Sequence, residues 1–174
     1  MEIAIVNKDT IKIKGKNVNF IVDPSTAITK TSADAVIFLT DVSDSTEQSA
    51  KVEGARVIIK GPGSYEVAGA RISATKSDND FFYLLNVDGL DVLVGRAREI
   101  EKQQDKGGCN ILVLNVDAEF KESIVSSFEP SVVVIYGDGA DAAVKSLGKE
   151  HQTLSKFSTA ADKLPSDVQI ILLK

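Results

Sequence analysis

The chain of 174 residues contains one cysteine, one histidine, one methionine and no tryptophan. A single cysteine, Cys109, can form neither an internal disulfide nor a thiolate cage for a metal, so a reducing cytoplasm is the expected setting. A site that draws on several imidazoles cannot be built from His151 alone. The formal net charge of −5 is mildly acidic and would repel a phosphate backbone, which argues against nucleic acid or an anionic membrane as a partner.

Long apolar runs are also absent. Apolar runs such as Ile111–Leu114 and Val132–Tyr136 have the length of strands and cannot cross a bilayer. The N-terminal sequence MEIAIVNKDTIKIKG alternates apolar and polar residues, unlike a secretion signal, which places a basic cluster before an apolar run. We therefore expect a soluble intracellular protein with one domain over residues 1–174, long enough to bury a substantial core.

Period-two alternation predicts strands in the first half of the chain. Three alternating stretches precede residue 23 and are separated by the turn sequences Asn7-Lys8-Asp9 and Gly15-Lys16-Asn17, which predicts an antiparallel meander. Asp23-Pro24 ends the third strand because proline lacks the amide that a strand pair needs. The continuous apolar run Ala35–Leu39 predicts a strand that is covered on both faces.

The stretch Arg56–Ser73 combines turn and strand signals most clearly. Its sequence, RVIIKGPGSYEVAGARIS, predicts a strand, a tight turn, a strand, a bend and another strand. We interpret Gly61–Ser64 as a plain hairpin turn, since a phosphate-binding loop would end in Gly-Lys-Ser/Thr and would lead into a helix. Asp88-Gly89 is a strong two-residue hairpin signal between the strands Phe81–Val87 and Leu90–Val94.

Strands and helices alternate in the second half, so the β-meander half covers about residues 1–95 and the β/α half about 96–174. A polar loop from Gly148 to Lys156 contains His151. Helices are expected over residues 96–106 (short and exposed), 119–128 and 138–147, and strands over Ile111–Val116, Val132–Tyr136 and Val168–Leu173.

Taken together, these pieces resemble the metallo-β-lactamase-fold hydrolases, in particular the branch similar to ascorbate-6-phosphate lactonase. The resemblance covers most of the chain and implies an α/β (α+β) fold, a four-layer αββα sandwich of two mixed β-sheets flanked by helices. The landmarks, in order, are GKNVNFIVDP (Gly15–Pro24), ADAVIFLT (Ala33–Thr40), GPGSYEVAG (Gly61–Gly69), Asp88–Gly95 and Val132–Tyr136.

The resemblance also implies where a metal site would lie, and there this sequence departs from the family. The family carries a His-x-His-x-Asp-His loop after the fourth strand, because zinc prefers imidazole nitrogen. A carboxylate in a later Gly-Asp pair bridges two metals, but here the pair is Gly95-Arg96, and a further histidine would fall near Asp138. In this sequence, the four positions of the His-x-His-x-Asp-His loop fall on Asp41, Ser43, Ser45 and Thr46. Three of these side chains are hydroxyls, which are poor ligands for zinc.

We therefore expect a non-catalytic, metal-free and degenerate member of this fold, with no cofactor, that binds an unknown protein partner or small ligand. Association into a homo-oligomer through free sheet edges is left open. The alternative is a hydrolase of altered chemistry that uses Asp41, Asp44 and Asp138, either without metal or with Asp141 around a hard cation. The candidate residues of the vestigial cleft are Asp41, Ser43, Asp44, Ser45, Thr46, Arg96 and Asp138.

Two of these signals have plainer explanations. The acidic loop after Thr40 could cap the next helix through Ser43, Asp44 or Ser45. Cys109 with His151 is formally a nucleophile and its base, but Cys109 leads into an apolar strand, which predicts a buried structural cysteine.

Overall fold

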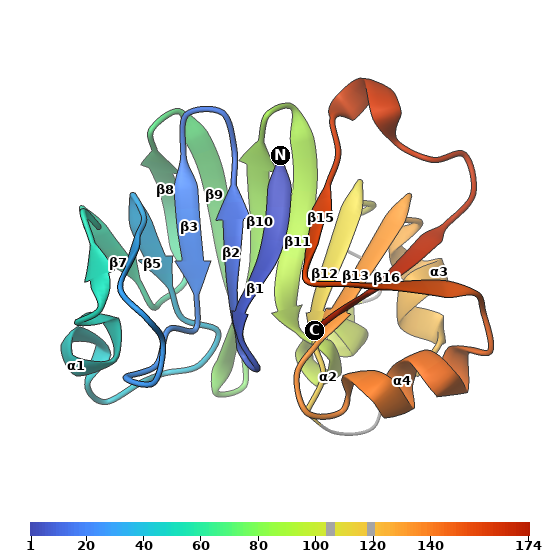
Figure 1. Cartoon of the computed structure of the whole chain (residues 1–174), viewed down its shortest axis with the longest axis horizontal. Coiled ribbons are helices and arrows are strands. Elements are labelled where there is room, and N and C mark those ends of the chain that lie inside the picture. The colour runs from blue at the N-terminus through green and yellow to red at the C-terminus, as the bar shows by residue number, and fades with distance from the viewer. Residues whose placement is uncertain (104–106, 118–120) are drawn as a thin grey trace.

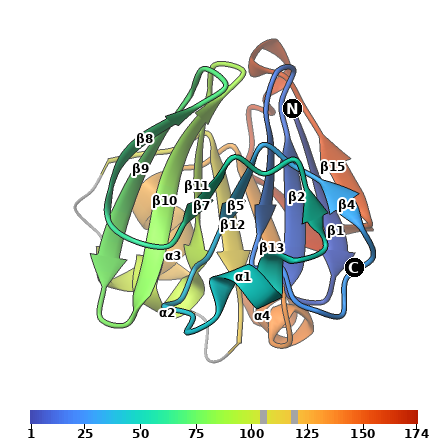
Figure 2. The same ribbon diagram turned by 90° about the vertical axis from the view of Figure 1, so that its left-hand side faces the viewer.

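Two β-sheets face each other, and the main hydrophobic core fills the space between them (Figures 1 and 2). The computed structural model of the chain describes residues 1–103, 107–117 and 121–174. Strands from both halves of the sequence contribute to each sheet. β15 from the C-terminal half joins the N-terminal strands of one sheet, and β8 to β11 join the C-terminal strands of the other. The alternating apolar residues predicted for these strands supply the inward side chains of this core.

The first sheet has six strands in the order β15-β1-β2-β3-β5-β7. Its strands are β15 (Lys156–Ser158), β1 (Glu2–Asn7), β2 (Thr10–Lys14), β3 (Asn19–Val22), β5 (Ala35–Ile37) and β7 (Val57–Ile59). The antiparallel meander β1-β2-β3 confirms the sequence prediction. β5 runs parallel to β3 and β7 parallel to β5. Every residue of β5 is fully buried, as its continuous apolar run predicts.

The second sheet has eight strands in the order β14-β16-β13-β12-β11-β10-β9-β8. Its strands are β14 (His151–Leu154), β16 (Gln169–Leu173), β13 (Val132–Tyr136), β12 (Ile111–Asn115), β11 (Leu90–Arg96), β10 (Asp80–Val87), β9 (Ala70–Ser77) and β8 (Gly63–Val67). β8 to β11 are antiparallel, and the strands from β11 to β14 are parallel. At the predicted hairpin between β10 and β11, Asp88 and Gly89 have φ of 54° and 78°.

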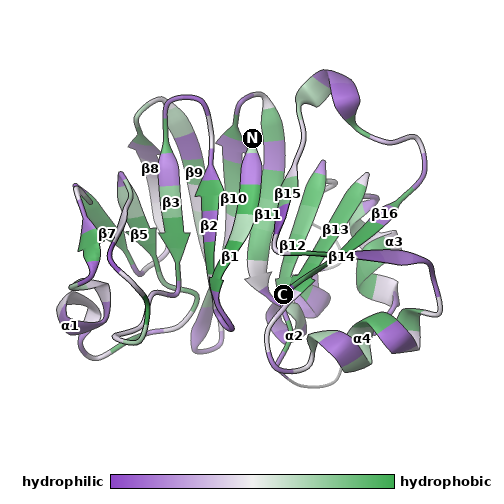
Figure 3. Ribbon diagram, viewed as in Figure 1, coloured by the Kyte–Doolittle hydropathy of each residue, from purple (hydrophilic) through white to green (hydrophobic). Residues whose placement is uncertain are grey.

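Helices cover the outer face of the parallel part of this second sheet (Figure 1). They are α2 (Ala97–Ile100), α3 (Ser123–Phe128) and α4 (Ala140–Leu147), and a 3-10 turn η1 (Glu101–Gln103) follows α2. Their apolar side chains and the outward residues of β12, β13 and β16 form a second core, and these strands are apolar along most of their length (Figure 3). Among the described helices, none is both long and apolar enough to cross a membrane.

The remaining elements are short. The helix α1 (Ser45–Ser49) lies beside β5 and β7 at one end of the first sheet (Figure 1). A parallel two-stranded pair joins β4 (Thr31–Ser32) and β6 (Val52–Glu53), and a 3-10 turn η2 (Ala161–Lys163) precedes β16. Mixed sheets packed together and flanked by helices are the α/β architecture that the sequence predicts.

The predicted hairpin turn at Gly61–Ser64 is wrong. β7 pairs with β5 in the first sheet, whereas β8 pairs with β9 in the second, so the turn carries the chain from one sheet to the other. The hydroxyl of Tyr65 donates a hydrogen bond of 3.1 Å to the carbonyl of Gly61 and closes this crossing. Turn residues show that the chain changes direction, but long-range pairing decides which strands become neighbours.

The polar segment Gly148–Lys156 is not a loop. His151–Leu154 forms β14 beside β16, and residues 156–158 form β15 beside β1. Both are sheet-edge strands. In β14, His151, Gln152 and Thr153 are exposed, so its hydrogen bonds to β16 and not its side chains define it. In β15 the side chain of Phe157 is buried in the main core, but one apolar residue in three is too short a pattern to predict a strand.

The helices differ from prediction mainly in length. α4 begins two residues later than predicted, at Ala140, and the described part of the helix expected over residues 119–128 begins at Ser123. Residues 104–106 and 118–120 lie outside the described residues. The helix after Arg96 was predicted to be exposed, but Ala97, Glu99 and Ile100 are buried.

Candidate functional site

Strands of both sheets end at one edge of the sandwich and bring polar residues there. In the second sheet, β11 ends at Arg96, while Asp117 and Asp138 follow β12 and β13 by two residues. In the first sheet, β3 leads into Asp23, and β5 continues to Thr40. Because ligands of α/β sheets bind beyond the carboxyl ends of the strands, this edge is the candidate site.

Two arginines and two aspartates form an ion-pair network at this edge. A terminal nitrogen of Arg96 and one of Arg98 lie 2.5 Å and 2.9 Å from the same oxygen, Oδ2 of Asp117. Arg98 also donates to Asp80 at 2.8 Å, while Nε of Arg96 lies 3.8 Å from the same Asp80 oxygen. The Asp80 side chain is 6 % exposed and the Asp117 side chain 29 %. Each guanidinium therefore lies between a buried and an accessible carboxylate.

The buried side of α2 holds the arginines in place. Glu99 is 3 % exposed and accepts a hydrogen bond of 2.7 Å from the hydroxyl of Ser77. Lys102 lies 3.0 Å from both oxygens of Glu99 and 2.6 Å from Asp78. These contacts attach α2 to the turn between β9 and β10. They also explain why the predicted exposed helix has a buried face, since a buried carboxylate must be paired.

Asp23 connects three strands of the first sheet beneath this network. Its Oδ1 accepts the amide of Leu39 at 2.7 Å, its carbonyl accepts the hydroxyl of Thr10 at 2.6 Å, and its own amide donates to Ile37 at 2.8 Å. Burial raises the pKa of Asp23 to about 7, against the opposing effects of the Leu39 amide and the Arg96 charge. The carboxyl group therefore changes charge near neutral pH.

Two buried polar atoms near Asp23 lack hydrogen bonds among the described residues. They are the hydroxyl of Tyr136, whose side chain is fully buried, and Nε of Arg96. Burial raises the pKa of Tyr136 well above its ordinary value, and the negative charge of Asp23 adds to this effect. Unpaired buried polar groups are uncommon and mark a site that has not been optimised for stability alone.

The loop after β5 contributes little to this network. Asp44 is the N-cap of α1, because its side chain accepts the amide of Glu47 at 2.8 Å. Ser45 is buried in the first turn of α1, whereas Asp41, Ser43 and Thr46 are exposed. The capping interpretation of this loop is confirmed for Asp44.

Asp138 lies apart from the arginine network. It forms an ion pair with Lys8 of the hairpin between β1 and β2, and both line a cavity of about 370 Å³ at the same edge. Apolar walls come from Ile5, Val6 and Leu173. Thus Arg96 and Asp138, predicted together, lie at one edge but have different partners.

The sequence interpretation missed four residues of the site: Asp23 as a titrating group, Asp80, Asp117 and Tyr136. Asp117 follows a buried strand just as Asp138 does, so the same strand-end rule could have identified it. Asp80 carries no such signal, because it belongs to a polar turn sequence that resembles any other surface turn.

Cys109 does not form a pair with His151. Cys109 is buried and precedes β12, whereas His151 is exposed on β14, and β16 and β13 lie between these two strands. Burial raises the pKa of Cys109 to about 12, so the thiol is not an activated nucleophile. The prediction of a buried structural cysteine is confirmed.

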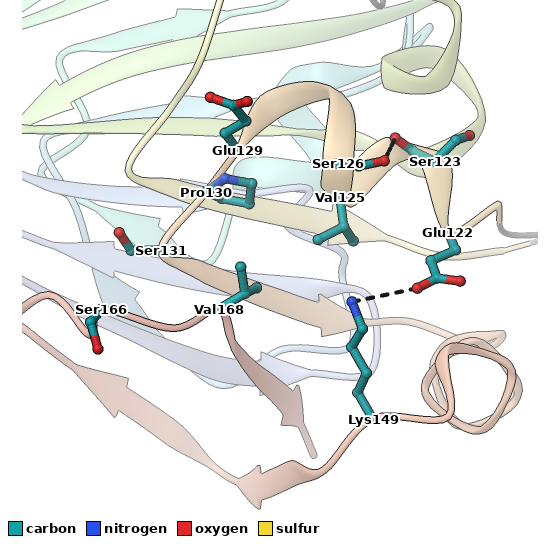
Figure 4. Close-up of a pocket in the computed structure, with 10 residues that line it drawn as sticks. All are labelled: Glu122, Ser123, Val125, Ser126, Glu129, Pro130, Ser131, Lys149, Ser166 and Val168. Atoms are coloured by element: carbon teal, nitrogen blue, oxygen red, sulfur yellow. Dashed lines mark hydrogen bonds and ion pairs between the residues drawn. The ribbon is translucent and has the colours of Figure 1, made fainter.

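A larger cavity, of about 600 Å³, lies at the opposite ends of the strands (Figure 4). Ser131 and Val168, which precede β13 and β16, line it, and an ion pair of 3.4 Å between Lys149 and Glu122 spans it. Its volume does not make it the better candidate, since it lies at the amino ends of the strands and holds none of the unpaired buried groups.

No protein-family model matches the chain, and no curated protein matches it. Solved structures do. A protein of Thermotoga maritima, provisionally assigned as a Zn-dependent hydrolase of the metallo-β-lactamase superfamily, superposes with a TM-score of 0.75 at 13 % identity over 99 % of this chain and 98 % of its own. The chain has the metallo-β-lactamase fold. Several further neighbours are hydrolases by name and another is a diiron β-hydroxylase, all at similarly low sequence identity.

Two of these neighbours show the range of names. A provisionally assigned metal-dependent hydrolase of Parabacteroides distasonis gives a TM-score of 0.66 at 17 % identity, over 99 % of this chain and 93 % of its own. An isothiocyanate hydrolase from Delia radicum gut bacteria gives 0.62 at 11 % identity, over 92 % and 100 %. At these identities the likeness establishes the fold and not the activity.

The residues of this metallo-β-lactamase fold do not fit the zinc that such names imply. Among residues 1–103, 107–117 and 121–174, no three His, Cys, Asp or Glu side chains are close enough together to hold a metal ion. The carboxylates Asp80 and Asp117 already pair with Arg96 and Arg98. The arginines are permanent cations and repel a metal ion. The hydroxyls in the loop after β5 are poor donors for a borderline-soft divalent metal.

Proposed function

We propose that this chain is a degenerate, metal-free metallo-β-lactamase-fold protein, similar to the ascorbate-6-phosphate lactonase-like branch, that binds a protein or small ligand without hydrolysing it. One observation carries the proposal. Arg96, at the position where the family has a metal-bridging carboxylate, is ion-paired to Asp117 and Asp80. The cytoplasm is the proposed compartment, because the one cysteine is free and reduced.

Charge explains why this arrangement opposes a metal. A guanidinium stays protonated at any physiological pH, so a divalent cation near Arg96 would meet a fixed positive charge. It would also have to displace Arg96 and Arg98 from the carboxylates that they now pair with. Both effects lower the affinity of the cleft for any divalent ion, hard or soft.

A binding role is supported by the space at the same edge. The cavity of about 370 Å³ between the β1–β2 hairpin and the start of α4 combines apolar walls with charged residues at its rim, as small-molecule sites commonly do. The alternative hydrolase, with Asp41, Asp44 and Asp138 as its reactive groups, takes second place. Asp44 caps α1 and Asp138 pairs with Lys8, which leaves these carboxylates without a common centre.

The test is metal content together with turnover. Purified protein is incubated with Zn²⁺, Mn²⁺ or Fe²⁺, desalted, analysed for metal by mass spectrometry and assayed on phosphoester, lactone and thioester substrates. We expect far less than one metal per chain and no saturable hydrolysis. An active zinc hydrolase of the same fold, treated in parallel, is the positive control. Stoichiometric metal with turnover that depends on it would contradict the proposal.

The variant Arg96→Asp is the matched probe. It restores a carboxylate at the metal-bridging position and removes the cation, so its metal content should exceed that of the unchanged protein if the charge of Arg96 is what excludes metal. Lys8→Ala, which removes a cation from the Asp138 pair at the same edge, controls for a general loss of positive charge. Equal metal uptake by both variants would remove the special role of Arg96.

A further inference from the structure

The arginine network has an uneven construction that a purely structural ion-pair cluster does not need. Both guanidinium groups converge on one oxygen of Asp117, and its other oxygen accepts no hydrogen bond from them. Nε of Arg96 is buried and makes no hydrogen bond. The pair therefore retains donor capacity that the protein itself does not use.

We propose that Arg96 and Arg98 form a binding site for the carboxylate of a small organic acid, and that Asp117 occupies this site in the free protein. The proposal rests on the binding role proposed above and names the chemical class of the ligand. The ligand carboxylate would replace that of Asp117, so binding exchanges one ion pair for another and changes no covalent bond.

Asp80 makes the pair a preformed site. It is buried and contacts both guanidiniums from one side, with Arg98 at 2.8 Å and Nε of Arg96 at 3.8 Å, so the orientation of the arginines does not depend on Asp117. Glu99 is buried as well and lies 3.6 Å from Nε of Arg98, but Lys102 at 3.0 Å balances its charge, so the two arginines around Asp80 leave a net positive charge directed at the position of Asp117. Arginine pairs favour planar carboxylates at such positions because several N–H donors can reach the same oxygens.

Asp117 is the member of the network that can leave. It follows β12 and is not part of it, and its side chain is 29 % exposed, against 6 % for that of Asp80. The side chains of Arg96 and Arg98 are 22 % and 45 % exposed, so a ligand can reach them from solvent. Because both partners are partly open to solvent, an incoming carboxylate can replace that of Asp117 without unfolding the edge of the sheet.

Space for the rest of the ligand lies one turn away from Asp117, in a cavity that Asp117, Arg96 and Arg98 do not themselves line. The carbonyl of Val116 accepts the amide of Gly139 at 2.7 Å, so the turn between β13 and α4 adjoins the residue before Asp117. The same turn lines the cavity of about 370 Å³ through Gly137 and Asp138, with the apolar Ile5 on its other side. A short aliphatic acid therefore suits the edge better than a purely polar anion.

The experiment removes the internal carboxylate. Asp117→Asn keeps the shape of the side chain and leaves the arginines in place, while Asp138→Asn removes an equivalent carboxylate from a lysine pair at the neighbouring strand end. Each protein is titrated with butyrate, acetate or inorganic phosphate against sodium chloride of equal ionic strength. Binding is read from the Nε–Hε signals of Arg96 and Arg98 in ¹⁵N NMR spectra.

We expect Asp117→Asn to bind butyrate at least tenfold more tightly than the unchanged protein, with acetate weaker and with both arginine signals shifting together. Asp138→Asn should show no gain. Thermal unfolding followed by circular dichroism verifies that both variants fold, and Asp117→Ser provides a second way to empty the site.

Other outcomes overturn the proposal. If neither Asp117 variant gains affinity for butyrate, the network is structural only. An equal gain in Asp138→Asn would reveal a nonspecific charge effect, and phosphate binding as tightly as butyrate would refute the choice of a carboxylate. These results leave the metal-free assignment untouched, because that assignment depends on metal content and turnover.

Discussion

Replacing Asp23 by asparagine tests the electrostatics beneath the candidate site. The asparagine Oδ1 can still accept the Leu39 amide, which now lies 2.7 Å from the aspartate oxygen. Position 23 has φ of 47°, in the left-handed region that asparagine tolerates well. The substitution therefore removes the charge and little else.

The sign follows from where Asp23 binds its proton. Burial raises its pKa from 3.8 to about 7 in the folded protein. The folded state consequently holds a proton between about pH 4 and pH 7 that the unfolded state has released. The Asp23 contribution therefore lowers the stability of the fold as pH rises through this range, and it is constant above about pH 7. Asparagine does not titrate, so Asp23→Asn lacks this change of stability with pH.

The magnitude follows from the pKa shift. Each pH unit between the two pKa values changes the free energy of unfolding by about 1.4 kcal/mol, so the interval from pH 5 to pH 7 accounts for about 3 kcal/mol. The residue as a whole is only half-buried, so solvent screening reduces this figure and we expect about 2 kcal/mol. The free energy of unfolding of Asp23→Asn minus that of the unchanged protein should therefore be about 2 kcal/mol larger at pH 8 than at pH 5.

Urea unfolding at pH 5, 6, 7 and 8, followed by circular dichroism, measures the difference between the two proteins and cancels the titration of all other groups. Asp34→Asn is the control, since the Asp34 carboxylate also accepts a backbone amide, that of Asn19 at 2.8 Å. A ¹³C NMR titration of the Asp23 carboxyl carbon gives its pKa directly. If the stability difference is the same at pH 5 and pH 8, Asp23 is ionised throughout and the burial explanation is refuted.

Three further predictions concern the packing of the fold. Gly137→Ala should lower the free energy of unfolding in urea by more than about 2 kcal/mol, since φ is 101° and the added Cβ would lie 2.9 Å from a backbone oxygen. Gly69→Ala is the control, because φ is 84° but the space around it is open, and it should cost only about 1 kcal/mol. Tyr83→Phe leaves the buried carbonyl of Phe38 without its 2.7 Å hydrogen bond and should lower the free energy of unfolding by about 1–2 kcal/mol. An unchanged free energy of unfolding would contradict this account. Burial raises the pKa of Cys109 to about 12, so a thiol reagent at pH 8 should react rapidly only after denaturation, and fast labelling of the folded protein would show that the thiol is accessible.

The predicted and missed elements differ in the kind of signal that determines them. The β1-β2-β3 meander and the hairpin at Asp88-Gly89 depend on local alternation and turn chemistry, so the sequence predicts them. β14 and β15 have little apolar pattern apart from the buried Phe157, and they form because β16 and β1 offer free edges. The crossing at Gly61–Ser64 has the residues of a hairpin turn. Only the pairing of β8 with β9 shows that this segment crosses between the sheets and does not form a hairpin.

The candidate site divides in a similar way. That Arg96 stands where the resemblance implies a metal-bridging carboxylate, and that hydroxyls occupy the loop after β5, could be read from the sequence because these positions have fixed spacing from recognisable strands. That Asp80 and Asp117 pair with Arg96 could not, because three separate segments meet only when the second sheet forms. The pKa of Asp23 was equally hidden, since burial is a property of the packed structure.

The sequence by itself determined the class of architecture and the presence of a single imidazole, too few for a zinc site built on several histidines, because residue type and short-range periodicity are local quantities. Only the tertiary structure decided which charges face one another, which carboxyl group is buried and which polar strands are paired. The physical reason is that electrostatic and hydrogen-bond energies depend on distances through space, and the folded chain sets those distances between residues far apart in the sequence.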